Sequence, residues 1–252
     1  MSDVTVSVDE SYVATVEIHR PPNNFFDAAL VRDLAEAYEA LDANPACRAI
    51  VLCSEGKHFC AGANLGTAAN PADEPRSLYE QAVRLFAGKL PVVAAVQGAA
   101  VGGGLGLALS ADFRVATEQS RFSANFAPLG FHHGFALTVT LPAAAGQQTA
   151  MDLLLTGRRV PGREALTLKL CDQLAPEDDL RATAHALAGQ IAASAPLAVA
   201  AIRATMRGDI VERVRKALDR EAGEQDRLRQ TEDFREGVTA SFERRDPHFE
   251  GR

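Results

Sequence analysis

A glycine cluster at 98–106, with the sequence GAAVGGGLG, could present unobstructed backbone amides to a ligand. Glycine lets a ligand atom approach the main chain closely, and the first N–H groups of a following helix are unpaired and lie at the positive end of its dipole. Such amides stabilise an oxyanion. The same glycines would also suit a tight strand–helix crossing, so the cluster alone leaves a catalytic and a packing role open.

The cluster does not match the glycine motifs of nucleotide-binding proteins. It lacks the GxxxxGK[ST] pattern of a P-loop. It also fails the GxGxxG pattern, because Leu107 stands where a third glycine would follow Gly102 and Gly104. The chain contains neither a GxSxG elbow nor an HExxH motif. We therefore expect no phosphate-binding loop, no dinucleotide site and no zinc-protease site.

Short apolar runs precede the small-residue turns that could carry this chemistry. Residues 49–53 (AIVLC) lead to the turn FCAGANL at 59–65, and residues 91–96 lead to the glycine cluster. Such runs are typical of buried parallel strands, and residues 113–116 predict a third. The repeated strand–turn–helix order predicts an α/β domain with parallel strands.

Flanking segments complete this arrangement. Residues 3–20 alternate in two runs and predict a β-hairpin, and Asp27 can cap a following helix whose apolar residues recur on one face. That face carries Leu30, Leu34, Tyr38 and Leu41. Residues 66–79 are polar with two prolines and predict a loop that could close over a substrate.

The chain reads as helical from about residue 182. Leu187 and Ile191 mark one helix, and residues 197–206 form another. A third, with Val211, Val214 and Leu218, carries many charges between few apolar residues. We expect this last helix to pack partly against a partner subunit.

Composition restricts the partners. The 252 residues have a net charge of −7, which disfavours nucleic-acid binding. No apolar run reaches the ~18 residues that span a bilayer, and the first ten residues do not resemble a signal peptide, so we expect no membrane partner and a cytoplasmic location. The four cysteines show no CxxC pair, which favours buried thiols and no metal site.

Several segments, in order, are similar to one known family. HFCAGANL at 58–65 is similar to the first signature of the crotonase (enoyl-CoA hydratase/isomerase) superfamily, with Asn64 in place of the usual Asp. PVVAAVQGAAVGGGLGLALSADFRVA at 91–116 is similar to the second. Further matching segments lie at 13–27, 121–130, 155–174 and 234–249. The chain resembles this superfamily over almost its whole length.

The resemblance implies a fold and an assembly. The expected fold is the α/β, ClpP-like crotonase spiral of repeated ββα units, with two roughly perpendicular sheets. Residues 1–190 would form the spiral core with an acyl-CoA site, and residues 191–252 a C-terminal helical region that drives trimerisation. The expected assembly is a homotrimer or a hexamer.

The resemblance also implies a site for an acyl-CoA thioester. The backbone N–H groups of Ala63 and Gly103 would form an oxyanion hole for an enolate. Coenzyme A is then part of the substrate, and no separate cofactor is expected. Arg244, Arg245 and Lys57 are candidates for its phosphates, with a solvated surface charge as the alternative for each. The substrate-binding residues implied are Phe25, Ala61, Ala63, Asn64, Leu65, Gly102, Gly103, Gly106, Phe126, Leu129 and Arg245.

Two positions depart from the family's hydratases. Gly106 and Phe126 stand where those enzymes carry the two glutamates that activate water, so standard hydration lacks its acid and base. His133 falls where other crotonase-like enzymes place different catalytic side chains. We hypothesise that His133, or its neighbour His132, is the acid/base; the alternative is a loop histidine bonded to backbone.

The reaction therefore stays open at this point. Hydration, isomerisation, decarboxylation and C–C cleavage all proceed through a stabilised enolate. Two rivals remain: an acyl-CoA-binding protein without turnover, and a hydrolase that uses His133 with water.

Overall fold

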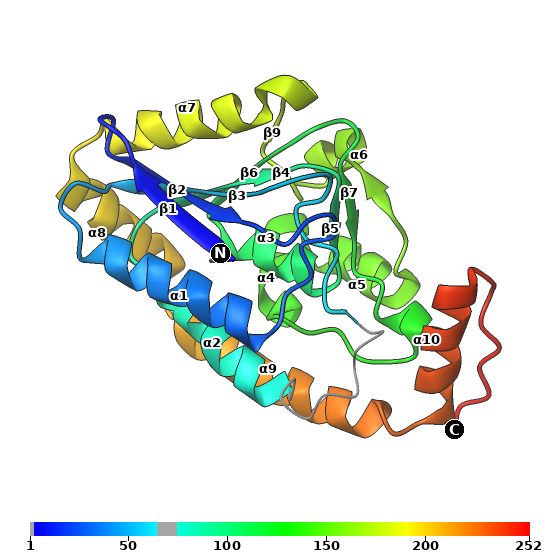
Figure 1. The fold of residues 1–252 in the computed structure, drawn as a ribbon. Coiled ribbons are helices and arrows are strands. Elements are labelled where there is room, and N and C mark those ends of the chain that lie inside the picture. The colour runs from blue at the N-terminus through cyan, green and yellow to red at the C-terminus, as the bar shows by residue number, and fades with distance from the viewer. Residues whose placement is uncertain (1–2, 65–74) are drawn as a thin grey trace.

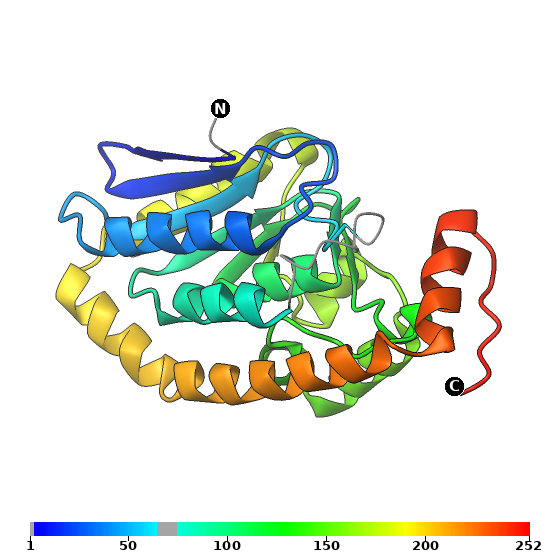
Figure 2. The same cartoon turned by 60° about the horizontal axis from the view of Figure 1, so that its bottom comes forward.

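A twisted sheet flanked by helices on both faces forms the body of the protein (Figures 1 and 2). The computed structural model describes residues 3–64 and 75–252. The larger sheet has the strand order β1-β2-β3-β4-β6-β9, and the smaller has the order β5-β7-β8. The strands of the larger sheet are β1 (Val4–Val8), β2 (Val13–Ile18), β3 (Ala49–Ser54), β4 (Val92–Val96), β6 (Phe113–Ala116) and β9 (Gln173–Leu174).

The pairing follows the sequence pattern. β1 and β2 form the predicted antiparallel hairpin, and β2, β3, β4, β6 and β9 run parallel. Every residue of β3 and β4 is buried, because helices cover both faces of a parallel sheet. The smaller sheet consists of β5 (Ala99–Val101), β7 (Arg121–Ser123) and β8 (Val160–Pro161), of which β5 and β7 are parallel and β7 and β8 antiparallel.

Alternate residues of each strand divide the core in two. Val51 and Val93 face α7 (Leu180–Ala192), whereas Ile50 and Leu52 face the larger core that contains α1 (Ala28–Asp42). The remaining helices are α2 (Pro75–Ala87), α3 (Gly103–Ser110), α4 (Leu137–Ala145), α5 (Gln147–Thr156), α6 (Gly162–Thr167), α8 (Pro196–Arg207), α9 (Ile210–Leu228) and α10 (Glu232–Glu243), with short 3-10 turns η3 (Ala127–Leu129) and η4 (Glu177–Asp179).

The predicted cap and apolar face of α1 are confirmed. The Asp27 side chain accepts a hydrogen bond from the backbone N–H of Leu30 at 2.8 Å. The face predicted from the spacing of Leu30, Leu34, Tyr38 and Leu41 is buried. The four cysteines are free and buried, as expected.

The predicted loop was wrong at its C-terminal end. The loop predicted for 66–79 ends earlier, because residues 75–79 begin α2; the remainder, 66–74, lies outside the described residues. The helix with Val211, Val214 and Leu218 was expected to pack partly against a partner subunit. In α9, Val214 and Leu218 are buried within this chain, where α9 packs along α2, and the contact with a partner subunit stays a prediction.

The helix with unpartnered apolar residues is α8 instead. It buries none of its residues in this chain, and Leu197, Ile202 and Met206 are exposed. Two arginines attach it to the sheet: Arg203 Nε and Arg207 Nη1 donate to the Asp112 carboxylate at 2.9 and 2.8 Å. Within the described ranges no single helix is long and apolar enough to cross a membrane, although the bent pair 177–192 and 196–207 passes that test jointly.

Candidate active site

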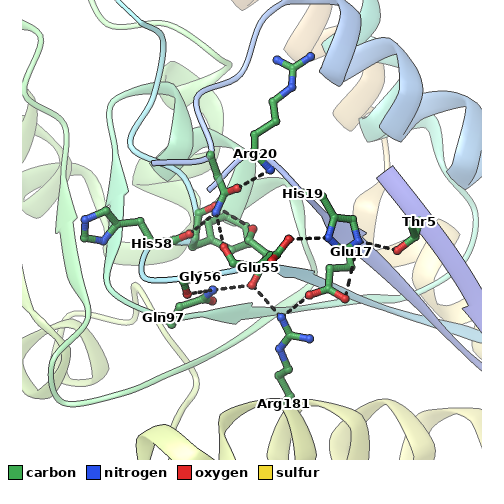
Figure 3. Close-up of polar contacts among 12 residues, drawn as sticks. Thr5, Glu17, His19, Arg20, Glu55, Gly56, His58, Gln97 and Arg181 are labelled. Carbon is green, nitrogen blue, oxygen red and sulfur yellow. Dashed lines mark hydrogen bonds and ion pairs between the residues drawn. The ribbon is translucent and has the colours of Figure 1, made fainter. Parts of the chain in front are cut away.

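A buried asparagine holds the turn that leads from β3 into the small-residue segment 59–64. The Asn24 amide donates to the carbonyl oxygens of Glu55 and His58 at 2.8 and 2.6 Å, and its oxygen accepts from the backbone of Arg20. The side chain of Gln97 donates to Ser54 O at 2.6 Å on the same turn. Figure 3 shows Arg20, Glu55, His58 and Gln97 gathered at this point. The turn is therefore fixed from several elements at once.

Close packing joins the turn at 59–64 to the glycine cluster. Cys60 and Ala100 form a bridge between the two segments, and Phe26 pairs with Ala63 on the other side. Gly62 has φ +89°, and a Cβ there would lie 2.8 Å from the carbonyl oxygen of Val101 and 3.9 Å from the nitrogen of Gly103. Glycine is thus required at position 62, and the Gly62–Ala63 peptide lies beside the amide of Gly103.

Two amides at this junction have no hydrogen-bond acceptor among the residues that the structure describes. The hydrogen bonds between described residues include none donated by the N–H of Ala63 or of Gly103. Gly103 is the first residue of α3, so its N–H has no partner inside the helix. Ala63 is exposed, whereas Gly103 is buried. The positive end of the α3 dipole thus lies beside the backbone N–H of Ala63, in the turn at 59–64.

The position of the first family glutamate has no room for a side chain. A Cβ at Gly106 would lie 2.6 Å from Cβ and 2.7 Å from the carbonyl oxygen of Phe135. Phe135 is buried with φ +57°, and its ring packs against that of Phe26 with centroids 5.3 Å apart. The Phe26 ring in turn covers Gly103. An aromatic pair therefore occupies the space on this side of α3.

Phe126, at the position of the second glutamate, extends the apolar wall. Its ring atom Cζ would lie 3.6 Å from a Cβ on Gly102, beside the start of α3. The ring packs edge-on against Phe131 at 5.3 Å between centroids and lies 6.5 Å from the ring of His133. Phe126 is thus buried, with Gly102 at the start of α3 and the rings of Phe131 and His133 as its neighbours.

The two histidines stack but make different hydrogen bonds. Their rings lie 4.0 Å apart. His132 Nδ1 donates to the carbonyl oxygen of His133 at 2.8 Å, which is the backbone-bonded arrangement of the alternative interpretation. His133 Nε2 instead contacts the hydroxyl oxygen of Thr138 at 2.8 Å. Burial and the His132 ring lower the pKa of His133 to about 3, so His133 is neutral at physiological pH.

A buried carboxyl group from α9 completes this cluster. Glu221 is fully buried, and its carboxylate accepts from the backbone N–H groups of Ala136 and Thr138 at 2.9 and 3.0 Å. The Thr138 hydroxyl lies 2.6 Å from Glu221 Oε1, and His133 Nε2 lies 3.8 Å from that oxygen. Burial raises the pKa of Glu221 to about 7.

A separate cavity of about 420 Å³ lies between the smaller sheet, η3 and α10. Val101 and Leu129 line it, together with the cations Arg121, Arg159 and Arg245. Arg245 is already paired, because its guanidinium contacts Glu236 and Glu243 at 2.5 and 2.6 Å. Arg121 and Arg159 form no ion pair among the described residues.

The other predicted substrate-binding residues are spread around the junction. Phe25 and Ala61 are half-buried, and Asn64 is exposed but has an interaction partner. Leu65 lies outside the described residues. Lys57 and Arg244 are exposed and form no ion pair within the part of the chain that the structure describes. In that part, no three His, Cys, Asp or Glu residues gather as metal ligands.

Sequence reasoning missed Phe135, Thr138 and Glu221. Thr138 stands five residues after His133, a spacing that carries no signal in a segment of unknown backbone shape. Glu221 is one of many charged residues in its helix. The one available hint was periodicity: Val214, Leu218 and Glu221 fall on one helical face at spacings of four and three.

Comparison with known proteins identifies the family and the fold. The family model for enoyl-CoA hydratase/isomerase matches residues 9–252. A carnitinyl-CoA dehydratase from Proteus mirabilis is 32% identical, with 95% of each chain covered. An enoyl-CoA hydratase/isomerase structure from Pseudoalteromonas atlantica T6c aligns with a TM-score of 0.90 at 32% identity, covering 99% of this chain and 100% of that one.

A second solved structure, an enoyl-CoA hydratase from Mycobacterium avium subsp. paratuberculosis K-10, aligns with a TM-score of 0.86 at 27% identity over 99% of each chain. The fold is therefore the crotonase fold that the sequence resemblance implied. With a family model over nearly the whole chain and relatives above 30% identity at near-complete coverage, this protein belongs to the enoyl-CoA hydratase/isomerase family.

Proposed function

We propose that this protein binds an acyl-CoA thioester and stabilises its enolate between the backbone N–H groups of Ala63 and Gly103. The observation that carries the proposal is that both amides lie at one junction, at the N-terminus of α3, and find no acceptor within the described ranges 3–64 and 75–252. Two preorganised donors aimed at a developing oxyanion supply several kcal/mol, of the order of 3 for each donor. The thioester carbonyl oxygen is the acceptor that this site fits.

The reaction that follows differs from ordinary hydration. Addition of water to a 2,3-double bond needs an acid and a base near Cα and Cβ. The positions of the two family glutamates hold Gly106, which Phe135 blocks, and Phe126, whose surroundings are apolar. We assign the proton-transfer role to His133, whose ring is neutral and lies 6.5 Å from the ring of Phe126, between centroids.

Loss of CO₂ from a 2-carboxyacyl thioester is the second candidate. It forms an enolate without a base, because the electrons of the breaking C–C bond pass into the thioester; water then supplies the proton to Cα. The aromatic wall of Phe26, Phe126, Phe131 and Phe135 favours this route. A dry pocket removes the hydration that stabilises the substrate carboxylate, whereas the neutral product CO₂ needs no hydration. The pocket therefore favours the loss of CO₂.

Coenzyme A carries phosphates that need cations in an acidic protein. The cavity beside α10 offers Arg121 and Arg159, whose charges are not neutralised by an ion pair among the described residues. Arg245, the residue implied by the resemblance, is neutralised by two glutamates. We therefore assign phosphate binding to Arg121 and Arg159 ahead of Arg245. Loss of CoA affinity in Arg159→Ala but not in Arg245→Ala would support this assignment.

The assembly is proposed from α8. Its exposed Leu197, Ile202 and Met206 form an apolar face that another copy of the chain would cover in a homotrimer or hexamer. Light scattering of the purified protein, alone and as Ile202→Asp, tests this point. A wild-type mass of one chain would contradict it.

The experiment that tests the function is incubation with saturated, 2,3-unsaturated and 2-carboxyacyl CoA thioesters, followed by mass spectrometry of the products. His133→Gln is the test variant, and His248→Gln, in the exposed tail, is the control. A mass gain of water identifies a hydratase, a loss of CO₂ a decarboxylase, and release of free CoA a hydrolase. Binding without any product would leave an acyl-CoA-binding protein and overturn the catalytic proposal. Turnover unchanged in His133→Gln would keep the enzyme and discard the histidine.

A further inference from the structure

Glu221 is a buried acid for which the proposed reaction has no use so far. Its side chain is fully buried, and no lysine or arginine pairs with it among the described residues. Its hydrogen-bond and ion-pair partners among the described residues are the amides of Ala136 and Thr138, the Thr138 hydroxyl and, at 3.8 Å, His133 Nε2. A buried carboxyl without a cation is costly to keep, so its contacts point to a role beyond packing.

The hydrogen bonds of this cluster allow one proton arrangement when Glu221 is ionised. A carboxylate only accepts, so the Thr138 hydroxyl must donate to Glu221 Oε1. That hydroxyl has a single proton, which is already donated to Glu221. In its contact with His133 the hydroxyl oxygen must therefore accept, so His133 Nε2 carries a proton and donates it. His133 is neutral, and its Nδ1 therefore carries the lone pair. No hydrogen bond among the described residues involves His133 Nδ1.

We propose that Glu221, acting through the hydroxyl of Thr138, is a positioning residue that fixes His133 as its Nε2–H tautomer and so makes Nδ1 the proton-accepting atom of the site. This inference rests on the proposed function of His133. The carboxylate also stabilises the imidazolium that forms when Nδ1 takes a proton, because the two groups lie 3.8 Å apart in a buried environment.

The cluster responds to pH through Glu221. When its carboxyl group is protonated, it donates to the Thr138 hydroxyl, which then donates to His133 Nε2 and reverses the tautomer. Burial places the pKa of Glu221 at about 7, so both arrangements occur near neutrality. The other titratable groups around the cluster are His132, stacked on His133, and Tyr79, which bonds Gln225 and whose pKa burial raises above its usual range. Arg229 influences Tyr79 from α9.

The test reads the tautomer directly. Protein labelled with ¹⁵N-histidine is examined by solid-state NMR at pH 6 and pH 8.5 without substrate, and His133→Gln assigns the resonances. The test variants are Thr138→Val, which removes the hydroxyl, and Glu221→Gln, whose amide oxygen accepts from the backbone N–H and the hydroxyl of Thr138 at every pH. Thr138→Ser restores the hydroxyl. Thr140→Val makes the same substitution on the same helix, where the threonine bonds only the carbonyl oxygen of Ala136.

The expected result is an Nε2–H tautomer at pH 8.5 in the wild type, Thr138→Ser and Thr140→Val, with conversion toward Nδ1–H at pH 6. Glu221→Gln should show Nε2–H at both pH values, and Thr138→Val should lose the pH dependence. A wild-type tautomer that is Nδ1–H at pH 8.5, or one unaffected by Thr138→Val, would overturn the proposal.

Activity provides a second readout. The second measurement is the pH profile of kcat with the substrate that the panel identifies. We expect kcat to fall as the pH drops through about 7 in the wild type and in Thr138→Ser. This fall should be absent from Glu221→Gln and from Thr138→Val. Because the tautomer is measured without turnover, a failure of the proposed function leaves that part of the test intact. A confirmed tautomer with inactive protein would refute only the catalytic role of His133.

Discussion

Replacing Gly106 by alanine tests whether Phe135 occupies the place of the first family glutamate. In an unobstructed helix this change stabilises a protein by up to ~1 kcal/mol. Gly106 lies inside α3, and an added Cβ would meet Phe135 Cβ at 2.6 Å and its carbonyl oxygen at 2.7 Å. The second contact is with backbone, so a rotamer change cannot relieve it. Overpacking of this kind costs roughly 1–3 kcal/mol.

We therefore expect Gly106→Ala to lose about 1–2 kcal/mol in free energy of unfolding, or a Tm lower by about 2–8 °C for a chain of this size. The matched control is Gly223→Ala in α9, where nothing lies within 4 Å of the added Cβ. That variant should gain up to ~1 kcal/mol. Urea unfolding measures both. Equal stability of the two variants would show that position 106 has room for a side chain, and the argument against a glutamate there would fail.

Three further predictions concern buried polar groups. Asp112→Ala should cost about 3 kcal/mol in urea unfolding, because it leaves the half-buried guanidinium of Arg203 without its carboxylate; an unchanged midpoint would contradict this. Asn24→Ala removes three hydrogen bonds and places alanine at φ +47°, so we expect a loss of about 2–4 kcal/mol, and Asn24→Gly, which tolerates that φ, should be the less destabilised. Burial raises the pKa of Glu221 from 4.5 to about 7 in the folded protein, so protonation of this group favours folding. Its contribution to the free energy of unfolding, up to ~3 kcal/mol, is fully present below pH 4.5 and is lost as the pH rises through 7. Urea unfolding between pH 5 and 8 should show this decline in the wild type and not in Glu221→Gln; parallel curves would refute the raised pKa.

Local patterns predicted the elements but not the contacts between distant ones. The hairpin, the buried strands and the Asp27 cap follow from alternation, apolar runs and a side chain three residues from its partner. These signals are carried by neighbouring residues, and tertiary structure did not override them. The loop prediction for 66–79 was wrong at 75–79 because Leu78 and Tyr79 pack against the core, which composition alone does not show.

The same limit applies to the site. The glycine cluster was readable because close backbone approach demands glycine at defined positions, such as Gly62 with φ +89°. The contact between Thr138 and Glu221 joins residues 83 positions apart and depends on how α9 crosses α4. No local pattern encodes that crossing. The charged character of α9 suggested a partner subunit, whereas its buried face meets α2 and α4 of the same chain.

The central claim is that Ala63 and Gly103 stabilise a thioester enolate, and deuterium incorporation at Cα tests it most directly. Acyl-CoA thioesters are incubated with the protein in D₂O and examined by mass spectrometry, so that any enolate is detected whatever step follows it. Ala63→Pro removes one of the two N–H donors, and Ala63→Ser keeps it. We predict deuterium at Cα with the wild type and Ala63→Ser, and a loss of about 100-fold or more in Ala63→Pro. Bound thioester without deuterium in the wild type, or equal exchange in Ala63→Pro, would contradict the account.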